Sequence, residues 1–502
     1  MLKKLRIILA MLFWTGITLL LLDFTGALHG WLGWMAKVQF LPAVLALNAA
    51  VIVALILLTL LFGRIYCSVI CPLGVFQDGV AHVSAARARR KKKPHYGWSS
   101  EKKWLRYGML VLFVIALIAG VQAFVAILAP YSAWGRIVQN LFQPIYIWIN
   151  NLFALAAERA GSYAFYTKEV WLRSLPTLIV AAVTLVTVIV LAWTGGRTWC
   201  NTVCPVGTTL GFLSRFSMFR PVIDKEKCKN CKACERVCKA SCIHIDAHEI
   251  DGSRCVDCFD CLESCKFDAL KYRFAWKIPG TSPGMTEGEP GNDGKAADAG
   301  RRAFLAGAAV AVGTAALRAQ GKKVDGGLAA VLDKEVPERN TPLTPPGSKS
   351  VKDFYRRCTA CQLCVAECPN NVLRPSSSLE HLMQPEMSYE RGWCRPECTR
   401  CAELCPAGAI RKITREEKTQ YRIGTARINR DLCIAEKGRH CGNCAVHCPA
   451  GAIQMVAVEG RKGSVPAVDE NRCIGCGACE FLCPVRPVSA ITVDGRLDHL
   501  ND

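Results

Sequence analysis

The chain has 502 residues, a net charge of +21 and 29 cysteines, and 51% of its residues are hydrophobic. The hydrophobic fraction excludes a disordered basic tail, and the length excludes a small secreted disulfide scaffold. Length alone indicates roughly three domain-sized units of about 150 residues. A membrane protein that carries many metal-bound thiolates fits all of these numbers.

Four long apolar runs occur in the first half, at about 6–22, 41–62, 107–129 and 176–194. Each is long enough to cross a hydrocarbon layer of about 30 Å as a helix. The alternative is a set of core helices in a large globular domain, but the run at 41–62 contains no charge. We therefore predict that residues 1–220 form an α-helical transmembrane four-helix unit made of two pseudo-repeated hairpins.

Basic residues predict the orientation of this unit, because Lys and Arg concentrate on the cytoplasmic side. They precede the first run (Lys3, Lys4, Arg6) and crowd the loop at 87–106, whereas the loop after the first run has only Lys37. Both ends of the unit are thus expected in the cytoplasm. The basic loop fits an anionic lipid surface better than nucleic acid.

Residues 131–172 are aromatic-rich and contain Pro144, which favours an interfacial or outward-facing segment over a fifth span. Asp23 and His29 lie nearby in sequence and are candidate residues of a quinol site. Their spacing is not specific, and interfacial polar residues would look the same.

The membrane half contains an internal repeat. Residues 63–74 (GRIYCSVICPLG) match residues 196–207 (GRTWCNTVCPVG), and each copy directly follows an apolar run. The repeat gives two C-x3-C-P pairs, with cysteines at Cys67, Cys71, Cys200 and Cys204. Four converging thiolates would bind a metal or a cluster. Redox-active thiol pairs and cysteines that merely pack are the alternatives.

The other cysteines form three dense blocks, each with two motifs of the bacterial ferredoxin type, C-x2-C-x2-C-x3-C. In such motifs the fourth cysteine crosses to the other cluster. We name each predicted site by its first cysteine. Block one gives the Cys228 site (Cys228, Cys231, Cys234, Cys265) and the Cys255 site (Cys255, Cys258, Cys261, Cys238). Proline usually follows the fourth cysteine, but Lys239 and Lys266 stand there, and Cys242 is a spare thiol that could replace Cys238.

Blocks two and three keep the C-P ending, and in two of their motifs only the first gap is longer. Block two gives the Cys358 site (Cys358, Cys361, Cys364, Cys405) and the Cys394 site (Cys394, Cys398, Cys401, Cys368). Block three gives the Cys433 site (Cys433, Cys441, Cys444, Cys483) and the Cys473 site (Cys473, Cys476, Cys479, Cys448). Zinc would suit an isolated pair of C-x2-C elements, but six such motifs indicate six [4Fe–4S] clusters.

The cysteine blocks predict the domain organisation. An α+β ferredoxin-like module is expected at 221–274, followed by a flexible linker at 275–300. Residues 301–319, which begin Arg301-Arg302-Ala303-Phe304-Leu305, resemble a twin-arginine export signal. An Ala-rich connecting helix inherited from a gene fusion is the alternative. A second linker at 320–352 and further modules at 353–415 and 425–496 complete the chain.

These motifs resemble those of a known family. Residues 1–272 resemble the NapH-type membrane ferredoxin quinol dehydrogenase subunit of periplasmic nitrate reductase systems. Residues 300–490 resemble a NapG/MauM-type polyferredoxin exported by the twin-arginine route. The resemblance implies a fusion of the two in the bacterial cytoplasmic membrane, with residues 221–274 cytoplasmic and the C-terminal polyferredoxin periplasmic.

The resemblance implies an electron conduit from (mena)quinol through the clusters to a periplasmic oxidoreductase. The expected partners are membrane lipid, the quinone pool and a periplasmic redox protein. No catalytic dyad or nucleotide motif appears, so no catalytic residue is assigned. The alternative function is a maturation factor that keeps a partner's metal or thiols reduced, with the C-x3-C-P pairs as thiols or a copper site. Each cluster carries about −2 when oxidised, which offsets much of the basic charge without nucleic acid.

Overall fold

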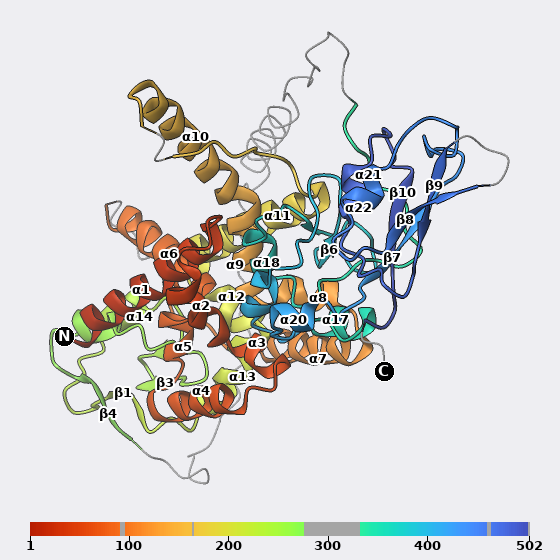
Figure 1. The fold of residues 1–502 in the computed structure, drawn as a ribbon. Coiled ribbons are helices and arrows are strands. Elements are labelled where there is room, and N and C mark those ends of the chain that lie inside the picture. The colour runs from red at the N-terminus through yellow and green to blue at the C-terminus, as the bar shows by residue number, and fades with distance from the viewer. Residues whose placement is uncertain (91–95, 163–164, 276–331, 459–462, 500–502) are drawn as a thin grey trace.

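The computed structural model describes residues 1–90, 96–162, 165–275, 332–458 and 463–499. The predicted twin-arginine segment at 301–319 lies outside the described residues, as does the predicted linker at 275–300 except for its first residue. The described chain has a helical unit, residues 1–214, and the three cysteine blocks, each of which is built around short antiparallel strand pairs (Figure 1).

Helices make up the N-terminal unit. In chain order they are α1 (Leu2–Leu22), α2 (His29–Lys37), α3 (Phe40–Leu45), α4 (Ala49–Phe62), α5 (Ile65–Val69), α6 (Pro72–Arg90), α7 (Lys103–Ala119), α8 (Gln122–Leu128), α9 (Pro130–Ile137), the π-helix η1 (Val138–Phe142), α10 (Gln143–Arg159), α11 (Leu175–Gly195), α12 (Thr198–Thr202) and α13 (Pro205–Ser214).

Only two of the four predicted spans are single helices. Among the described residues, α1 and α11 are the helices long and apolar enough to cross a membrane. The run at 41–62 is divided between α3 and α4, because Leu47 adopts a left-handed conformation and the side chain of Asn48 caps α4. The run at 107–129 is divided where Gly120, with φ of +80°, ends α7. The prediction of four uninterrupted spanning helices was therefore wrong for these two runs.

Block one contains β1 (Phe219–Ile223), α14 (Ala233–Val237), β2 (Ile243–His244), β3 (Glu249–Ile250), α15 (Asp260–Ser264) and β4 (Leu270–Phe274). The first and last strands pair antiparallel, with Phe219 opposite Phe274, and thus join the two ends of the block. The middle strands form a second pair. Each cysteine motif runs along a loop and then through a one-turn helix.

Blocks two and three repeat this plan. Block two contains α17 (Val351–Arg357), α18 (Leu363–Ala366), β5 (Leu373–Pro375), β6 (Pro385–Met387), α19 (Arg400–Leu404) and α20 (Arg415–Lys418). Block three contains β7 (Gly424–Ile428), α21 (Asn443–Val446), β8 (Ile453–Ala457), β9 (Ser464–Val468), α22 (Ala478–Leu482) and β10 (Ile491–Gly495). The strand pairs are β5–β6, β8–β9 and β7–β10, all antiparallel.

The predicted linker at 320–352 is folded in its described part. Arg339 pairs with Glu480 of block three at 2.7 Å, and Leu343 is buried in the core shared by blocks two and three. The backbone N–H of Glu335 donates to the carbonyl of Pro487 at 2.9 Å. Residues 332–350 are thus a strap across block three. No local pattern predicts this strap, because its contacts with block three are to residues more than 100 positions away.

Block one and block two lie at opposite ends of the helical unit, with block one at the lower left of Figure 1. At the start of α1, Lys3 pairs with Asp260 of block one at 3.1 Å. Just after α1 ends, the carbonyl of Thr25 accepts a hydrogen bond from Arg400 of block two at 3.1 Å. A helix of 21 residues is about 31 Å long at 1.5 Å per residue, so α1 separates the two blocks by roughly its own length.

Candidate iron–sulfur sites

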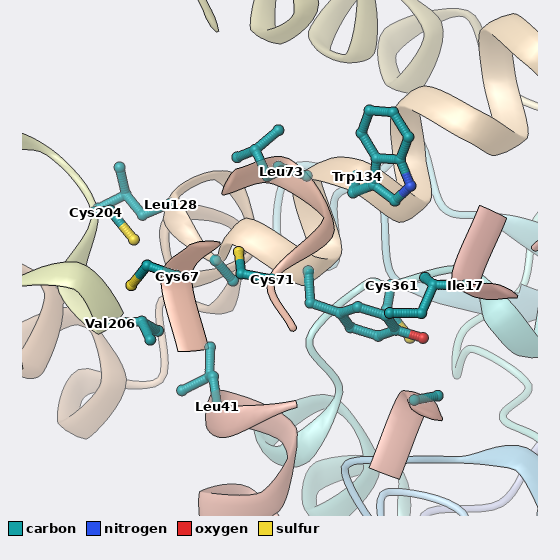
Figure 2. Packing of buried hydrophobic residues seen from close by; sticks show 14 of the residues in the cluster. Ile17, Leu41, Cys67, Cys71, Leu73, Leu128, Trp134, Cys204, Val206 and Cys361 are labelled. Atoms are coloured by element: carbon teal, nitrogen blue, oxygen red, sulfur yellow. The ribbon is translucent and has the colours of Figure 1, made fainter. Parts of the chain in front are cut away.

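The two C-x3-C-P motifs meet in the core of the helical unit. We call Cys67, Cys71, Cys200 and Cys204 the four-thiol site; each of these side chains is at most 5% exposed. Figure 2 shows Cys67, Cys71 and Cys204 gathered at one place in the core, with Cys361 of block two in the same cluster. The expected convergence of the repeated motifs is therefore present in the structure.

Two arginines cross between the motifs. Arg64 precedes the first motif, yet its Nη2 donates to the carbonyl of Cys200 at 3.2 Å. Arg197 precedes the second motif, and its Nη1 donates to the carbonyl of Cys67 at 3.0 Å. The same groups approach the sulfurs, at 3.9 Å for Arg64 to Cys67 and 3.7 Å for Arg197 to Cys200. Both arginines are fully buried, so two fixed positive charges face thiols that must be anionic to bind iron.

Glycines allow the helices to approach this closely. A Cβ placed on Gly74 would lie 2.2 Å from the carbonyl oxygen of Cys67, and one on Gly207 would lie 2.2 Å from that of Cys200. The equivalent contact in both copies shows that the repeat preserves a backbone approach that only glycine permits. The sequence repeat contains both glycines and both arginines, but the crossed contacts of the arginines are a property of the tertiary structure.

A buried charge network lies beside the four-thiol site. Asp78 of α6 pairs with Arg6 at 2.7 Å, with Arg197 at 2.8 Å and with Lys239 at 3.5 Å. Burial by itself would raise the pKa of Asp78, but attraction to Arg197, Lys239 and Arg6 outweighs it and lowers the pKa well below 3.8. Asp78 thus joins α1, the second C-x3-C-P motif and block one through one carboxylate. Sequence reasoning missed Asp78, which no motif marks.

The two lysines that replace proline in block one have different surroundings. Lys239 is 7% exposed, pairs with Asp260 at 2.8 Å, and accepts a backbone hydrogen bond from Arg197 at 2.9 Å. Lys266 is exposed. Lys239 therefore fixes the Cys255 site against the four-thiol site, where Val256 and Cys258 pack on the same core as Cys67. Cys231 of the Cys228 site is exposed on the outer side of the block.

Three cavities are bounded by cysteines from both motifs of a predicted pair. One cavity of about 410 Å³ is bounded by cysteines of both block-one motifs, another of about 360 Å³ by those of the Cys394 site, and a third of about 350 Å³ by those of the Cys433 site. In each case the fourth cysteine of one motif faces the first three of the other motif. The cysteines around these cavities are Cys238, Cys242, Cys255, Cys258 and Cys261; Cys368, Cys394, Cys398 and Cys401; and Cys433, Cys441, Cys444 and Cys483.

Neighbouring cysteines affect the pKa of one another at the remaining predicted sites. Burial, together with Cys358 and Cys405, raises the pKa of Cys364. Burial, together with neighbours that include Cys448, raises the pKa of Cys479. Burial also raises the pKa of Cys234 to about 11, with Cys231 and Cys265 nearby. Thiols must release their protons to bind a metal, and the positive charge of iron supplies the driving force.

A [4Fe–4S] cube suits the cysteine-lined cavities of this chain. The four thiolates of a [4Fe–4S] cube bind four different irons and therefore stand farther apart than the ligands of one metal ion. Buried, apolar cavities with four cysteines at their edges are the surroundings that such a cube requires.

Comparisons with known proteins agree with this geometry. The family model described as "4Fe-4S binding domain" matches residues 45–94 and 177–223, which contain the four-thiol site, and "4Fe-4S dicluster domain" matches residues 437–486. "Methylamine utilization ferredoxin-type protein MauM" of Methylophilus methylotrophus is 30% identical over 154 residues, which is 29% of this chain and 68% of that protein. The chain belongs to the NapH/MauM family of ferredoxin-type proteins.

The matches to two further relatives span most of the length of each relative. "Ferredoxin-type protein NapH" of Haemophilus influenzae is 26% identical over 243 residues, 47% of this chain and 70% of that protein. "Methylamine utilization ferredoxin-type protein MauN" of Paracoccus denitrificans is 27% identical over 217 residues, 43% of this chain and 62% of that protein. This NapH/MauM-type chain is thus an iron–sulfur protein of the ferredoxin type that acts in electron transfer.

The two candidate quinol residues of this NapH/MauM-type protein have structural contacts. The carboxylate of Asp23 accepts hydrogen bonds from the backbone N–H groups of Thr25, Gly26 and Leu28, at 2.8, 3.0 and 2.8 Å. Burial alone would raise the pKa of Asp23, but a hydrogen bond from the Thr25 hydroxyl at 2.7 Å, together with these backbone bonds, lowers it. His29 pairs with Glu403 of block two at 3.6 Å. Asp23 therefore shapes the turn after α1, and His29 belongs to the contact with block two.

The Cys255 site of this NapH/MauM-type protein has five cysteines around its cavity where four are needed. Cys242 is 2% exposed, and its Sγ lies 3.6 Å from Sγ of Cys238. A hydrogen bond from Cys242 is the largest cause that lowers the pKa of Cys238 to about 7. Both thiols face the cavity of the Cys255 site, so proximity alone does not choose between them.

We expect Cys238→Ala to remove the iron of one cluster and Cys242→Ala to leave the iron content unchanged. The reason is that the three-residue gap before Cys238 recurs before the fourth cysteine of every other motif. Two measurements on each purified variant test this expectation. They are the iron content per chain and the electron paramagnetic resonance spectrum of the reduced clusters. Equal iron loss in the two variants would contradict this ligand assignment.

Proposed function

We propose that this chain is a fusion of a NapH-type and a NapG/MauM-type protein that carries electrons across the cytoplasmic membrane. Electrons from a quinol reach a periplasmic redox protein through [4Fe–4S] clusters at the six predicted cysteine sites and at the four-thiol site. Each cluster, when bound, supplies reversible one-electron transfer. In this proposal the residues of the chain arrange the sites one after another and keep water away from them. They also provide the packing and the charges around each site.

The observation that carries this proposal is the position of the blocks on the two membrane-length helices. The N-terminal end of α1 contacts block one through Lys3, and its C-terminal end is followed by Thr25, which contacts block two. The helix α11 is antiparallel: Ser174 at its start lies 3.2 Å from Ser377 of block two, and Gly196 at its end approaches Lys239 of block one. If these helices span the bilayer, the two blocks lie on opposite sides of it.

The helical unit provides a continuous core between the two ends. A single buried cluster includes Cys67 and Cys71 of the four-thiol site, Tyr131 of α9 and Cys361 of block two. Tyr131 is 2% exposed, and burial together with Cys361 raises its pKa. Gly135, one helical turn on, approaches the carbonyl of Cys361 so closely that a Cβ would lie 2.2 Å from it. The four-thiol site therefore lies between the Cys255 site and the Cys358 site.

The proposed succession of cluster sites continues from block two into block three. Cys401 of the Cys394 site is among the neighbours that raise the pKa of Cys364 in the Cys358 site. The backbone N–H of Cys394 donates to the carbonyl of Cys476 at 2.9 Å, which joins the Cys394 site to the Cys473 site. The Cys433 site shares block three with the Cys473 site and lies beside α21, where Val446 is 80% exposed. We infer that electrons leave near α21.

The maturation function has less structural support. A single copper ion needs its ligands around one centre, and the part of the chain that the structure describes has no such group of three or more. Thiol exchange needs an accessible thiolate, whereas every sulfur of the four-thiol site is buried. Both observations favour a buried cluster over a working thiol pair.

An epitope appended to the C terminus is expected to bind an impermeant antibody on intact spheroplasts. The same epitope inserted at Ala247, in the exposed turn of block one, is expected to bind only after permeabilisation. This result follows if α1 and α11 cross the membrane with block one in the cytoplasm. The paired tags make each variant the control of the other, and labelling of both tags on the same side would overturn the transmembrane arrangement.

A further inference from the structure

The helix α9 brings two buried polar side chains, Tyr131 and Arg136, to the junction with block two. Tyr131 is 2% exposed, and Arg136 is fully buried. Gly135 of the same helix approaches the carbonyl of Cys361 so closely that a Cβ would lie 2.2 Å from it. Residues four positions apart lie on one face of a helix, so Tyr131 shares the face that Gly135 presents to block two. The Cys358 site therefore lies against α9.

Hydrogen bonds from the elements on either side of α9 hold this junction together. Nε2 of Gln122 in α8 donates to the carbonyl of Arg356 at 2.7 Å. Nδ2 of Asn140 in η1 donates to Oε1 of Gln362 at 3.0 Å. The two acceptors flank the first two cysteines of the Cys358 site in the sequence. The helical unit thus fixes the position of this cysteine motif relative to α9.

The hydroxyl of Tyr131 is a hydrogen-bond donor that the protein does not use. It is buried and has no partner among the described residues. Its electrostatic neighbours include three of the four cysteines of the predicted Cys358 site: Cys361, Cys405 and Cys364. A buried hydroxyl without an acceptor costs free energy. The sulfurs of a cluster at this site would be acceptors for it.

Arg136 is a buried charge without a carboxylate partner. Its Nη1 donates to the carbonyl of Ala126 at 2.8 Å, but its Nε and Nη2 have no partner in the part of the chain that the structure describes. The acidic group that acts on Arg136 there is the thiol of Cys361. Burying a charge is costly unless an opposite charge compensates it. An oxidised cluster with four thiolates carries about −2, which is the compensation that Arg136 lacks.

We propose that Tyr131 and Arg136 raise the reduction potential of the cluster at the Cys358 site. Tyr131 donates a hydrogen bond to a cluster sulfur, and Arg136 provides a fixed positive charge. Reduction adds one electron and makes the cluster more negative, so a donor and a cation beside it favour the reduced state. The proton of Tyr131 stays on its oxygen, and no covalent bond forms or breaks.

This inference rests on the proposed function for the presence of a cluster at the Cys358 site. It adds a direction to one step of the conduit. The Cys358 site is the site of block two that shares a core with the four-thiol site. A raised potential there would draw electrons out of the helical unit into block two, and two residues of α9 would set that potential.

The test is a potentiometric titration of the full-length protein in nanodiscs, followed by electron paramagnetic resonance. Cys361→Ser and Cys405→Ser each change one ligand of the Cys358 site and identify the signal of its cluster. We expect Tyr131→Phe to keep the wild-type iron content and to lower the equilibrium constant for reduction of this cluster about tenfold, which is about 59 mV for one electron. Arg136→Gln is expected to lower it as well, and Arg136→Lys, which keeps the charge, to lower it less.

Tyr66→Phe is the matched control. Tyr66 is another tyrosine of the helical unit that is 2% exposed, but its hydroxyl donates to Oε1 of Gln39 at 3.1 Å. The proton of Tyr66 is therefore used within the protein. Its loss is expected to lower the melting temperature and to leave the potential of the Cys358 cluster unchanged.

An unchanged potential in Tyr131→Phe would overturn the inference and leave the conduit intact, whether or not the melting temperature falls. An equal shift in Tyr66→Phe would also overturn it, since any buried hydroxyl would then have the same effect. If neither serine variant changes a signal or the iron content, the Cys358 site holds no cluster. That result would overturn both this inference and the part of the proposed function that uses the site.

Discussion

Asp78→Asn is expected to destabilise the protein by about 3–5 kcal/mol, the usual cost of removing one partner from a buried ion pair. The carboxylate is 8% exposed and is shared by Arg6, Arg197 and Lys239. Asparagine has nearly the same shape but no charge, so three buried cations would lose their common counter-charge. Because these cations come from α1, the second C-x3-C-P motif and block one, we also expect block one to detach.

The pH dependence follows from the lowered pKa of Asp78. A carboxyl group whose folded pKa lies below its unfolded value stabilises the fold fully above the unfolded value, near pH 4. The stabilisation disappears as the pH falls through the folded pKa. Wild type and Asp78→Asn should therefore differ most at neutral pH and converge only in strong acid.

Thermal unfolding of the cluster-loaded protein, with proteolysis of block one as a second readout, measures this effect. Asp246→Asn is the control, since the exposed pair between Asp246 and Lys232 is expected to contribute nothing measurable. Asp78→Glu keeps the charge and is expected to lose less stability than Asp78→Asn. Equal melting temperatures for wild type and Asp78→Asn would refute the role given to this network.

Cys67→Ala combined with Cys200→Ala is expected to stop electron passage between block one and block two. The four-thiol site shares a core with residues of both blocks, and removing two of its four thiolates would remove ligands of the cluster proposed there. In proteoliposomes, dithionite outside and trapped ferricyanide inside would report the passage, because neither ion crosses the bilayer readily. The double variant should show the rate of protein-free liposomes.

The control for this experiment is Cys242→Ala, which also removes a buried thiol but not one of the four-thiol site. It is expected to pass electrons as the wild type does. Iron analysis should show that the double variant keeps the clusters of the three blocks. If the double variant passes electrons at the wild-type rate, the path does not use the four-thiol site.

The crossed pairing of cysteines is a prediction that depends on local geometry alone. A C-x2-C-x2-C loop can bind only one cube, and the three-residue gap directs the fourth cysteine to the next one. Cavities such as the one between Cys368 and the Cys394 motif agree with this expectation. Apolar length was a weaker guide. It identified α1 and α11, but it could not show that Asn48 and Gly120 divide the other two runs.

The sequence by itself determined the chemistry of this protein: the cysteine spacing, the C-x3-C-P repeat and the two membrane-length helices are all short-range patterns. Only the tertiary structure decided where these parts lie relative to one another. Lys239 looked like a departure from the ferredoxin pattern, yet it joins block one to Asp78, which lies 161 positions earlier in the chain. Such contacts depend on the packing of whole elements, and no local pattern of residues specifies them.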